Sequence, residues 1–339
     1  MSVPCLAAIV ALAGAPAVTP PPAPGATVEA RLHAALAAIA AGSDGRVSVT
    51  VRHLRTGQGA SLRGDRPQPS MSVFKLPLAV AVLAEVDAGR LRLGTRVPIA
   101  ERELRQVSPI AEAWWRGEER APPLRSMLEH MVRDSDNTAG DKLVAMLGGG
   151  AAVTARLRAL GVTGIEVAGP ELSRDAALYC GDRPPPQGGW SLAAVAACPP
   201  RAPDALGAAV RRVIDAPADA ATSDGVVELL ARLDRGTILS ARSRAALLAA
   251  MTASTTGPDR LRAGVPPGTP VAHKTGTSQA FEVPAPGTRL AVNDAGIITL
   301  PGGDRFAIAV FIAGSHAPLD EQEAIIARMA RASWEIFVR

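Results

Sequence analysis

The ends of this chain carry β-strand patterns while its middle carries helical patterns, and this order limits the possible folds most. Residues 46–54 alternate, with Val47, Val49 and Val51 on one face, which predicts a half-buried strand. Two further strands are predicted at 295–300 and 306–313, joined by a turn. The simplest fold joins these terminal strands in one antiparallel sheet flanked by helices. We therefore expect an α/β protein in which the middle of the chain forms an all-helical lobe.

Helical spacing of apolar residues fills most of the remaining chain. Residues 72–86 are apolar nearly all round, which indicates a buried helix. Gly57 and Gly59 predict a turn after the first strand, so a hairpin partner should follow. Prolines and glycines interrupt 172–220, where we expect little regular structure. Other helical patterns cover 27–41, several segments up to 159 with the triple glycine 148–150 as a loop, 225–233, 240–251 and 320–337.

The first residues resemble an export signal. An apolar run at 6–13 precedes Ala15-Pro16-Ala17, which predicts cleavage after Ala17 and a periplasmic or secreted protein. A proline-rich tether follows, so 1–25 is assigned to signal and tether. Residues 26–339 are then one catalytic domain, with an α/β part at 26–72 and 256–339 and a helical part at 73–255. No stretch is long and apolar enough to cross a membrane, so stable membrane insertion is not expected.

The composition and the spacing of the histidines argue against nucleic acid, metal ions and cofactors as partners. The 339 residues carry a net charge of +4, but basic and acidic residues are interspersed and only 3% are aromatic. Nucleic-acid binders usually gather positive charge in one patch, so this chain is not expected to bind nucleic acid. The five histidines show no ligand spacing, which predicts neither a metal nor a cofactor. We expect a monomer with a small-molecule substrate.

Lysine is scarce in this arginine-rich chain. It occurs only at Lys75, Lys142 and Lys274, among 36 basic residues. A lysine can lose its proton when buried, which an arginine cannot. Ser72 lies one helical turn before Lys75, where a partly desolvated amine could take the proton of the hydroxyl. Chance alone produces such a four-residue pattern fairly often, so it needs support from other motifs.

Two further motifs supply polar groups. Ser135-Asp136-Asn137 offers a hydroxyl and an amide, although a helix-capping turn explains the same residues. Lys274-Thr275-Gly276-Thr277 precedes the final strands. If it is itself a strand, it offers an ammonium, two hydroxyls and, at Gly276, close approach of the backbone.

The three motifs together resemble the Ser-x-x-Lys, Ser-Asp-Asn and Lys-Thr-Gly set of class A β-lactamases and penicillin-binding proteins, in the same order. The resemblance covers most of 28–337 and lapses at 176–215. It implies that Ser72 is acylated by a β-lactam, that Lys75 helps to take its proton, and that Ser135 relays a proton to the leaving nitrogen. It also implies that Asn137 holds the substrate's side-chain amide and Lys75. The expected carboxylate-binding residues are Lys274, Thr275 and Thr277, and backbone amides of Ser72 and Thr277 would form an oxyanion hole.

The residue that activates the deacylating water is less well determined. An ungapped comparison with the family places Glu171 at this position, and we adopt it. A gapped comparison matches Pro170-Glu171-Leu172 to the family's usual Pro-Glu-Leu and puts Gly169 there, which cannot act as a base. In either case the usual preceding Arg is absent, and Ser173 or Asp175 replaces the Asn that helps to hold the water.

Two alternative functions remain open, and so does the pairing of two cysteines. A D-alanyl-D-alanine peptidase shares the acylation step but lacks a deacylating Glu, and a penicillin sensor acylates once without turnover. The sensor usually comes with a membrane segment or extra domain, and neither is visible. After removal of the signal, which contains Cys5, Cys180 and Cys198 either form a disulfide or remain two free thiols.

Overall fold

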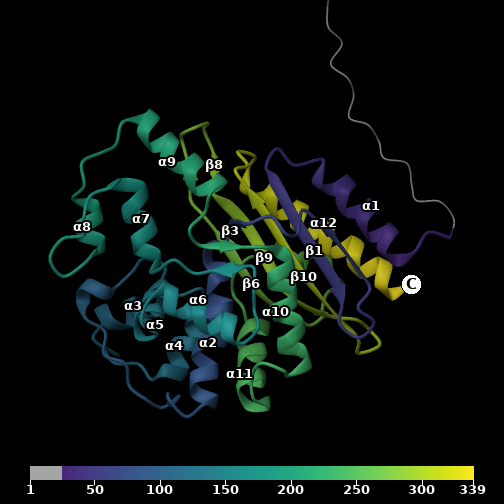
Figure 1. The fold of residues 1–339 in the computed structure, drawn as a ribbon, viewed down its shortest axis with the longest axis horizontal. Helices are drawn as coiled ribbons and strands as arrows, with labels where there is room; N and C mark the ends of the chain where they lie inside the picture. Colours follow the sequence, from purple (N-terminus) through teal and green to yellow (C-terminus); the bar gives the residue numbers. More distant parts are fainter. Residues whose placement is uncertain (1–24) are drawn as a thin grey trace, which may run out of the picture.

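A computed structural model describes residues 25–339, so the predicted signal and nearly all of the tether lie outside the described residues. The large helices of this part surround one main sheet (Figure 1). The helices are α1 (Val28–Ala40), α2 (Lys75–Asp87), α3 (Pro109–Trp115), α4 (Leu124–Arg133), α5 (Asn137–Met146), α6 (Gly150–Ala159), α7 (Glu171–Tyr179), α8 (Leu192–Ala196), α9 (Pro203–Asp215), α10 (Ser223–Arg235), α11 (Ala241–Thr252) and α12 (Leu319–Val338).

The main sheet is antiparallel and joins the two ends of the chain, as the sequence predicted. Its order is β2-β1-β10-β9-β6, so N-terminal strands lie beside C-terminal ones. Val49 pairs with Val310 across the junction between β1 and β10. The bounds are β1 (Arg46–His53), β2 (Gly59–Leu62), β6 (Val271–Thr277), β9 (Ala291–Thr299) and β10 (Arg305–Ala313). The predicted hairpin partner after Gly57 is β2.

The two faces of the sheet bury different helices. Val47, Val49 and Val51 pack with α1 and α12, which lie side by side on one face (Figure 1). Ser48 and Thr50 point to the other face, where Ser48 Oγ lies 3.0 Å from Oγ of Ser223 at the start of α10. The larger core lies on this second face and includes α2, α4, α5, α6, α10 and α11. Helix α2 is buried along nearly its whole length, which its apolar sequence predicted.

The segment that carries Ser72 lies between the sheet and the helices. A 3-10 turn, Met71–Phe74, leads directly into α2 and contacts β6 and β9. Two small sheets were not predicted: β3 (Gln68–Pro69), β5 (Ala220–Ala221) and β4 (Ile165–Glu166) form one, and β7 (Ala280–Phe281) pairs with β8 (Thr288–Arg289) in the other.

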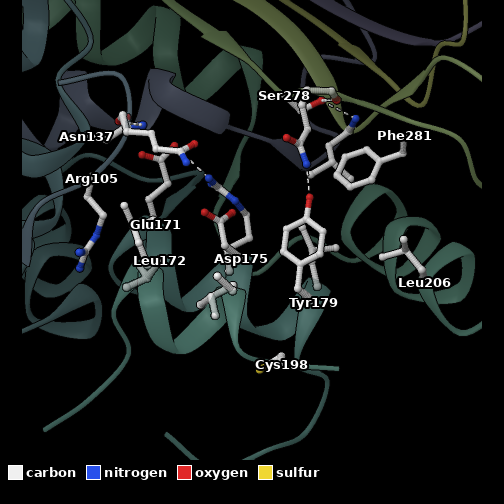
Figure 2. A pocket seen from close by; sticks show the side chains of 18 of the residues that line it. Arg105, Asn137, Glu171, Leu172, Asp175, Tyr179, Cys198, Leu206, Ser278 and Phe281 are labelled. Carbon is white, nitrogen blue, oxygen red and sulfur yellow. Dashed lines mark hydrogen bonds and ion pairs between the residues drawn. The ribbon is translucent and has the colours of Figure 1, made fainter. Parts of the chain in front are cut away.

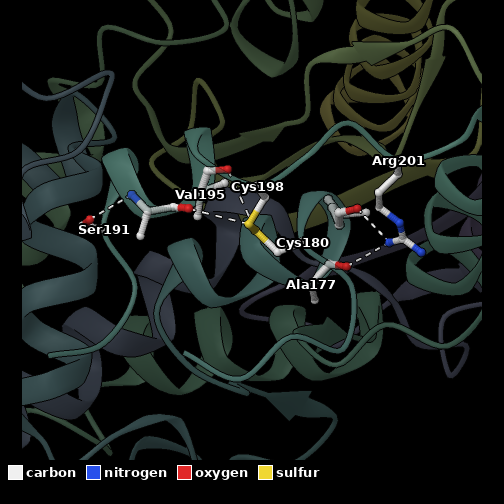
Figure 3. The surroundings of a disulfide bond; sticks show 8 residues. Ala177, Cys180, Ser191, Val195, Cys198 and Arg201 are labelled. Carbon is white, nitrogen blue, oxygen red and sulfur yellow. Dashed lines mark hydrogen bonds between the residues drawn. A yellow bond between two sulfur atoms is a disulfide. The ribbon is translucent and has the colours of Figure 1, made fainter. Parts of the chain in front are cut away.

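The prediction of little regular structure at 172–220 was wrong. Helices α7, α8 and α9 occupy this segment, and Cys180 at the end of α7 forms a disulfide with Cys198 just after α8 (Figure 3). Prolines mark helix starts here as well as loops: Pro170, just before the segment, precedes α7, and Pro203 is the first residue of α9. Proline at a first helical position costs little, because that residue's N–H has no partner within the helix.

The helical prediction up to 159 was also too broad, since 88–108 contains only a short 3-10 turn, Glu101–Glu103. The triple glycine does separate α5 from α6, although Gly150 is already the first residue of α6. Within residues 25–339, no helix has the length and apolar character needed to cross a membrane.

Candidate active site

Ser72 and Lys75 lie together at the junction of the 3-10 turn and α2. Lys75 Nζ is 3.1 Å from Ser72 Oγ, which the three-residue spacing on a helical face allows. The same ammonium donates to the carbonyl oxygen of Ser135 at 2.7 Å and to Oδ1 of Asn137. Lys75 is fully buried, so these contacts replace water around its charge.

The Ser135-Asp136-Asn137 motif has both of the roles considered for it. Asp136 caps α5 by accepting from Ala139 N at 2.8 Å, and also accepts from Ser108 Oγ at 2.8 Å. Ser135 adopts a left-handed backbone conformation, with φ of 61°, immediately before this cap. The turn brings the Ser135 hydroxyl and the Asn137 amide to Lys75, so capping and site formation come from the same residues.

Strand β6 brings the second lysine to the same place. Lys274 Nζ lies 3.0 Å from Ser135 Oγ and is fully buried. The hydroxyl of Thr275 is 2.7 Å from that of Thr256, and Thr277 Oγ1 accepts from Arg260 Nη2 at 2.7 Å. The Lys-Thr-Gly-Thr motif lies within β6, so the strand that the sequence analysis considered for it is present.

Glu171 reaches the cluster from the first turn of α7. Its Oε2 lies 3.6 Å from Lys75 Nζ, and its backbone N–H donates to Asp141 on α5. Gly169, the other candidate position, is different: a Cβ placed there would meet no atom within 4 Å. The chain thus places a carboxylate next to Lys75 at 171.

The charges of this buried cluster shift one another's pKa values. Burial lowers the pKa of the Lys75 ammonium against the pull of the Glu171 carboxylate. Burial, helped by the charge of Lys75, lowers the pKa of Lys274 well below its usual range. Burial alone would raise the pKa of Glu171, but the charges of Lys75 and Arg174 outweigh it and bring it to about 2. Glu171 is therefore ionised at neutral pH, and the two lysines lose protons more readily than lysines in water.

A cleft of about 810 Å³ opens beside these residues. Figure 2 shows Glu171, Asp175 and Tyr179 projecting from α7 toward it, with Asn137 at one end and Phe281 at the other. Tyr179 accepts a hydrogen bond from Gln279, which closes one side between α7 and the end of β6. The lining of the cleft also includes the apolar side chains of Leu192, Val195 and Leu206. No group of three or more His, Cys, Asp or Glu residues suited to a metal occurs in residues 25–339.

Sequence reasoning missed three charged residues of the site. Arg174 donates to Glu171 Oε1 at 2.9 Å, Arg260 donates to Thr277, and Asp141 holds the backbone of Glu171. The spacing of Arg174, three residues after Glu171, was a visible signal for an ion pair on one helical face. No local pattern marks Arg260 or Asp141, because their partners lie far away in the sequence.

Comparison with known proteins identifies the family. A model of the β-lactamase enzyme family matches residues 31–337. The chain belongs to this family. It is 33% identical to the extended-spectrum β-lactamase PER-1 of Pseudomonas aeruginosa over 79% of this chain and 74% of that protein. Among solved structures, a β-lactamase from Chitinophaga pinensis is 33% identical with a TM-score of 0.72, covering 88% of this chain and 97% of that one. The TLA-1 extended-spectrum β-lactamase is 26% identical with a TM-score of 0.76, covering 92% and 100%.

These comparisons confirm the predicted class A serine β-lactamase, and with it the hydrolase class and the fold of an antiparallel sheet flanked by helices. They favour neither the peptidase nor the sensor. The comparisons assign no role to individual side chains of this chain, and their roles are proposed below from the geometry of the site.

Proposed function

We propose that this β-lactamase opens β-lactams through an acyl-enzyme on Ser72 and releases the product with Glu171 as the base for water. The observation that supports the proposal is that several polar groups meet at one buried ammonium group, that of Lys75. Lys75 Nζ lies close to Ser72 Oγ, to the carbonyl oxygen of Ser135 and to Glu171 Oε2. These three partners come from three separate segments of the chain. A hydroxyl, an amine and a carboxylate in such contact are the parts that nucleophilic catalysis with a separate hydrolytic step requires.

In the acylation step, Ser72 Oγ attacks the lactam carbonyl carbon and its proton passes to Lys75. The lowered pKa of Lys75 supports this, because a neutral amine is needed to accept a proton. The lactam C–N bond then breaks, and the nitrogen takes a proton from Ser135 Oγ. Ser135 in turn recovers a proton from Lys75, whose Nζ lies 3.5 Å from that oxygen. Lys274, 3.0 Å from that oxygen, would stabilise the serine's negative charge while the proton is away.

Binding is assigned to β6 and α5. Lys274, Thr275 and Thr277 would hold the substrate carboxylate, with the Arg260 guanidinium next to Thr277 adding positive charge. Gly276 lets the backbone lie close to the Ser72 segment, and the amides of Ser72 and Thr277 would bind the carbonyl oxygen as charge develops there. Asn137 would hold the substrate's side-chain amide.

In the deacylation step, Glu171 accepts one proton from a water whose oxygen bonds to the acyl carbon. The bond from that carbon to Ser72 Oγ then breaks. Ser72 Oγ takes a proton from Lys75, and Lys75 takes the proton that Glu171 accepted, so that all three groups return to their starting states. The low pKa of Glu171 keeps it ionised and ready to accept. The family and the expected signal, with cleavage after Ala17, also support export to the periplasm or medium, and the enzyme would act as a monomer on a small β-lactam.

A chromogenic cephalosporin and a penicillin test this proposal. The purified protein should hydrolyse the cephalosporin, and Ser72→Ala should lose both turnover and covalent labelling by the penicillin. The other described hydroxyl at Lys75, that of Ser135, lies farther from Nζ, at 3.5 Å against 3.1 Å for Ser72. Ser61→Ala, an exposed serine on β2, is the matched control and should behave as wild type. A penicillin adduct on Ser72→Ala in the intact mass would contradict the assignment.

A further inference from the structure

The two oxygens of Glu171 have different surroundings. Oε1 accepts a hydrogen bond from Arg174 Nη2 at 2.9 Å within α7. Oε2 is buried and has no hydrogen-bond partner among the described residues, and Lys75 Nζ lies 3.6 Å from it. Both side chains of the ion pair are largely buried, at 13% exposure for Arg174 and 12% for Glu171. A buried carboxylate oxygen without a partner costs free energy unless something occupies the position opposite it.

We propose that Arg174 is a positioning residue that binds Oε1 and thereby leaves Oε2 as the oxygen that accepts the proton of the deacylating water. The inference rests on the proposed function of Glu171 and goes beyond it by naming the oxygen and the side chain that selects it. No other described side chain donates a hydrogen bond to Glu171, so Arg174 supplies the one directional contact that orients the carboxylate, beside the ion pair with Lys75.

An arginine suits this task because its guanidinium only donates and does not release its proton. It can occupy Oε1 without competing with water as an acid or with Oε2 as an acceptor. Burial opposes the charge, yet the carboxylates of Glu171, Asp175 and Asp219 raise the pKa of Arg174, so the cation persists. Asp175, one turn beyond Glu171, has no donor to offer once ionised and cannot replace Arg174.

Arg174 also affects how readily Glu171 is protonated. The charges facing Glu171 are Lys75 on α2, Asp141 on α5, Arg174 and Asp175 on α7, Asp219 just before β5, and Lys274 on β6. Removing the Arg174 cation while the others stay must raise the pKa of Glu171. The protonated, inactive fraction then grows at mildly acidic pH, and the acid limb of deacylation moves to higher pH.

The test separates acylation from deacylation in single-turnover measurements with a penicillin followed by intact mass. Arg174→Gln should acylate within about threefold of wild type but deacylate up to ~10²-fold more slowly, the usual cost of a misplaced catalytic group. Its acid limb should lie at higher pH than that of wild type. Arg174→Lys, which keeps a donor and a charge, should recover part of the rate. Arg158→Gln removes an exposed cation that pairs with Glu166 on the surface, and should change neither step.

Three results would overturn the inference. They are deacylation by Arg174→Gln as fast as wild type, an equal loss in both steps, and an unchanged acid limb. If Arg174→Gln does not fold, Arg174→Lys decides by the same comparison of the two steps. It should acylate like wild type and deacylate more slowly, and an equal loss in both steps would overturn the inference. Failure of the proposed function would look different, since Glu171→Gln would then continue to turn over.

Discussion

At the scale of single residues, the site depends on a glycine, Gly276, as well as on its reactive side chains. Gly276 packs against the segment that carries Ser72. A Cβ at 276 would lie 2.8 Å from the carbonyl oxygen of Ser70 and 3.0 Å from Cβ of Met71. Both distances are shorter than normal contacts, so β6 can approach the nucleophile's segment this closely only without a side chain at 276.

Gly276→Ala should therefore push β6 away from the 3-10 turn that carries Ser72. We expect a loss of stability of about 1–3 kcal/mol, the usual cost of overpacking a tight site, together with slower acylation. Chemical denaturation and single-turnover kinetics measure the two effects. Gly302→Ala, in the turn between β9 and β10 where a Cβ meets nothing within 4 Å, is the control. A variant with wild-type stability and acylation would show that the close packing is not required.

The sequence revealed some residues of the site and not others, for a compositional reason. Lys75 and Lys274 were recognisable because lysine is rare in this chain. Arg260 does not stand out among so many arginines, and only the folded chain shows that it lies beside Thr277. For Arg174 the sequence offers its spacing from Glu171, but not its burial. The assignment of Glu171 over Gly169 stays a prediction, supported by the contact with Lys75.

At the scale of elements, the segment from α7 to α9 is where sequence reasoning failed. Frequent prolines and glycines suggested irregular chain, but they separate short alanine-rich helices, and alanine favours helix strongly. The disulfide joins Cys180, at the end of α7, to Cys198, just after α8 (Figure 3). Because α7 also carries Glu171 and Arg174, this bond restrains the side of the cleft that holds the proposed base.

Thiol titration tests the disulfide directly. Unreduced, denatured protein that lacks residues 1–17 should show no free thiol. Replacing Cys180 and Cys198 by alanine should lower the free energy of unfolding by up to about 3 kcal/mol, because the bond closes a loop with a sequence separation of 18. Wild-type protein after mild reduction serves as the matched comparison. Two reactive thiols in the unreduced protein would contradict the pairing.

At the scale of the whole molecule, the order of patterns along the chain was enough to predict that the terminal strands share one antiparallel sheet, but not the order of the strands in it. Strand patterns at both ends have few ways to bury their apolar faces, and pairing β1 with β10 is the simplest. The two small sheets were not predictable, because strands of two residues carry no periodicity. The boundaries of the α/β and helical parts, the monomeric state and the export signal stay predictions.

The most direct test of the central claim is the intact mass of Glu171→Gln during reaction with a penicillin. The isosteric change keeps the volume and removes the base, typically worth about 10²–10⁴ in rate. The account predicts that the variant acylates at Ser72, gains the mass of one ligand and stays acylated, while wild type and the surface control Glu166→Gln return to the free mass. A Glu171→Gln enzyme that turns over at the wild-type rate would contradict it.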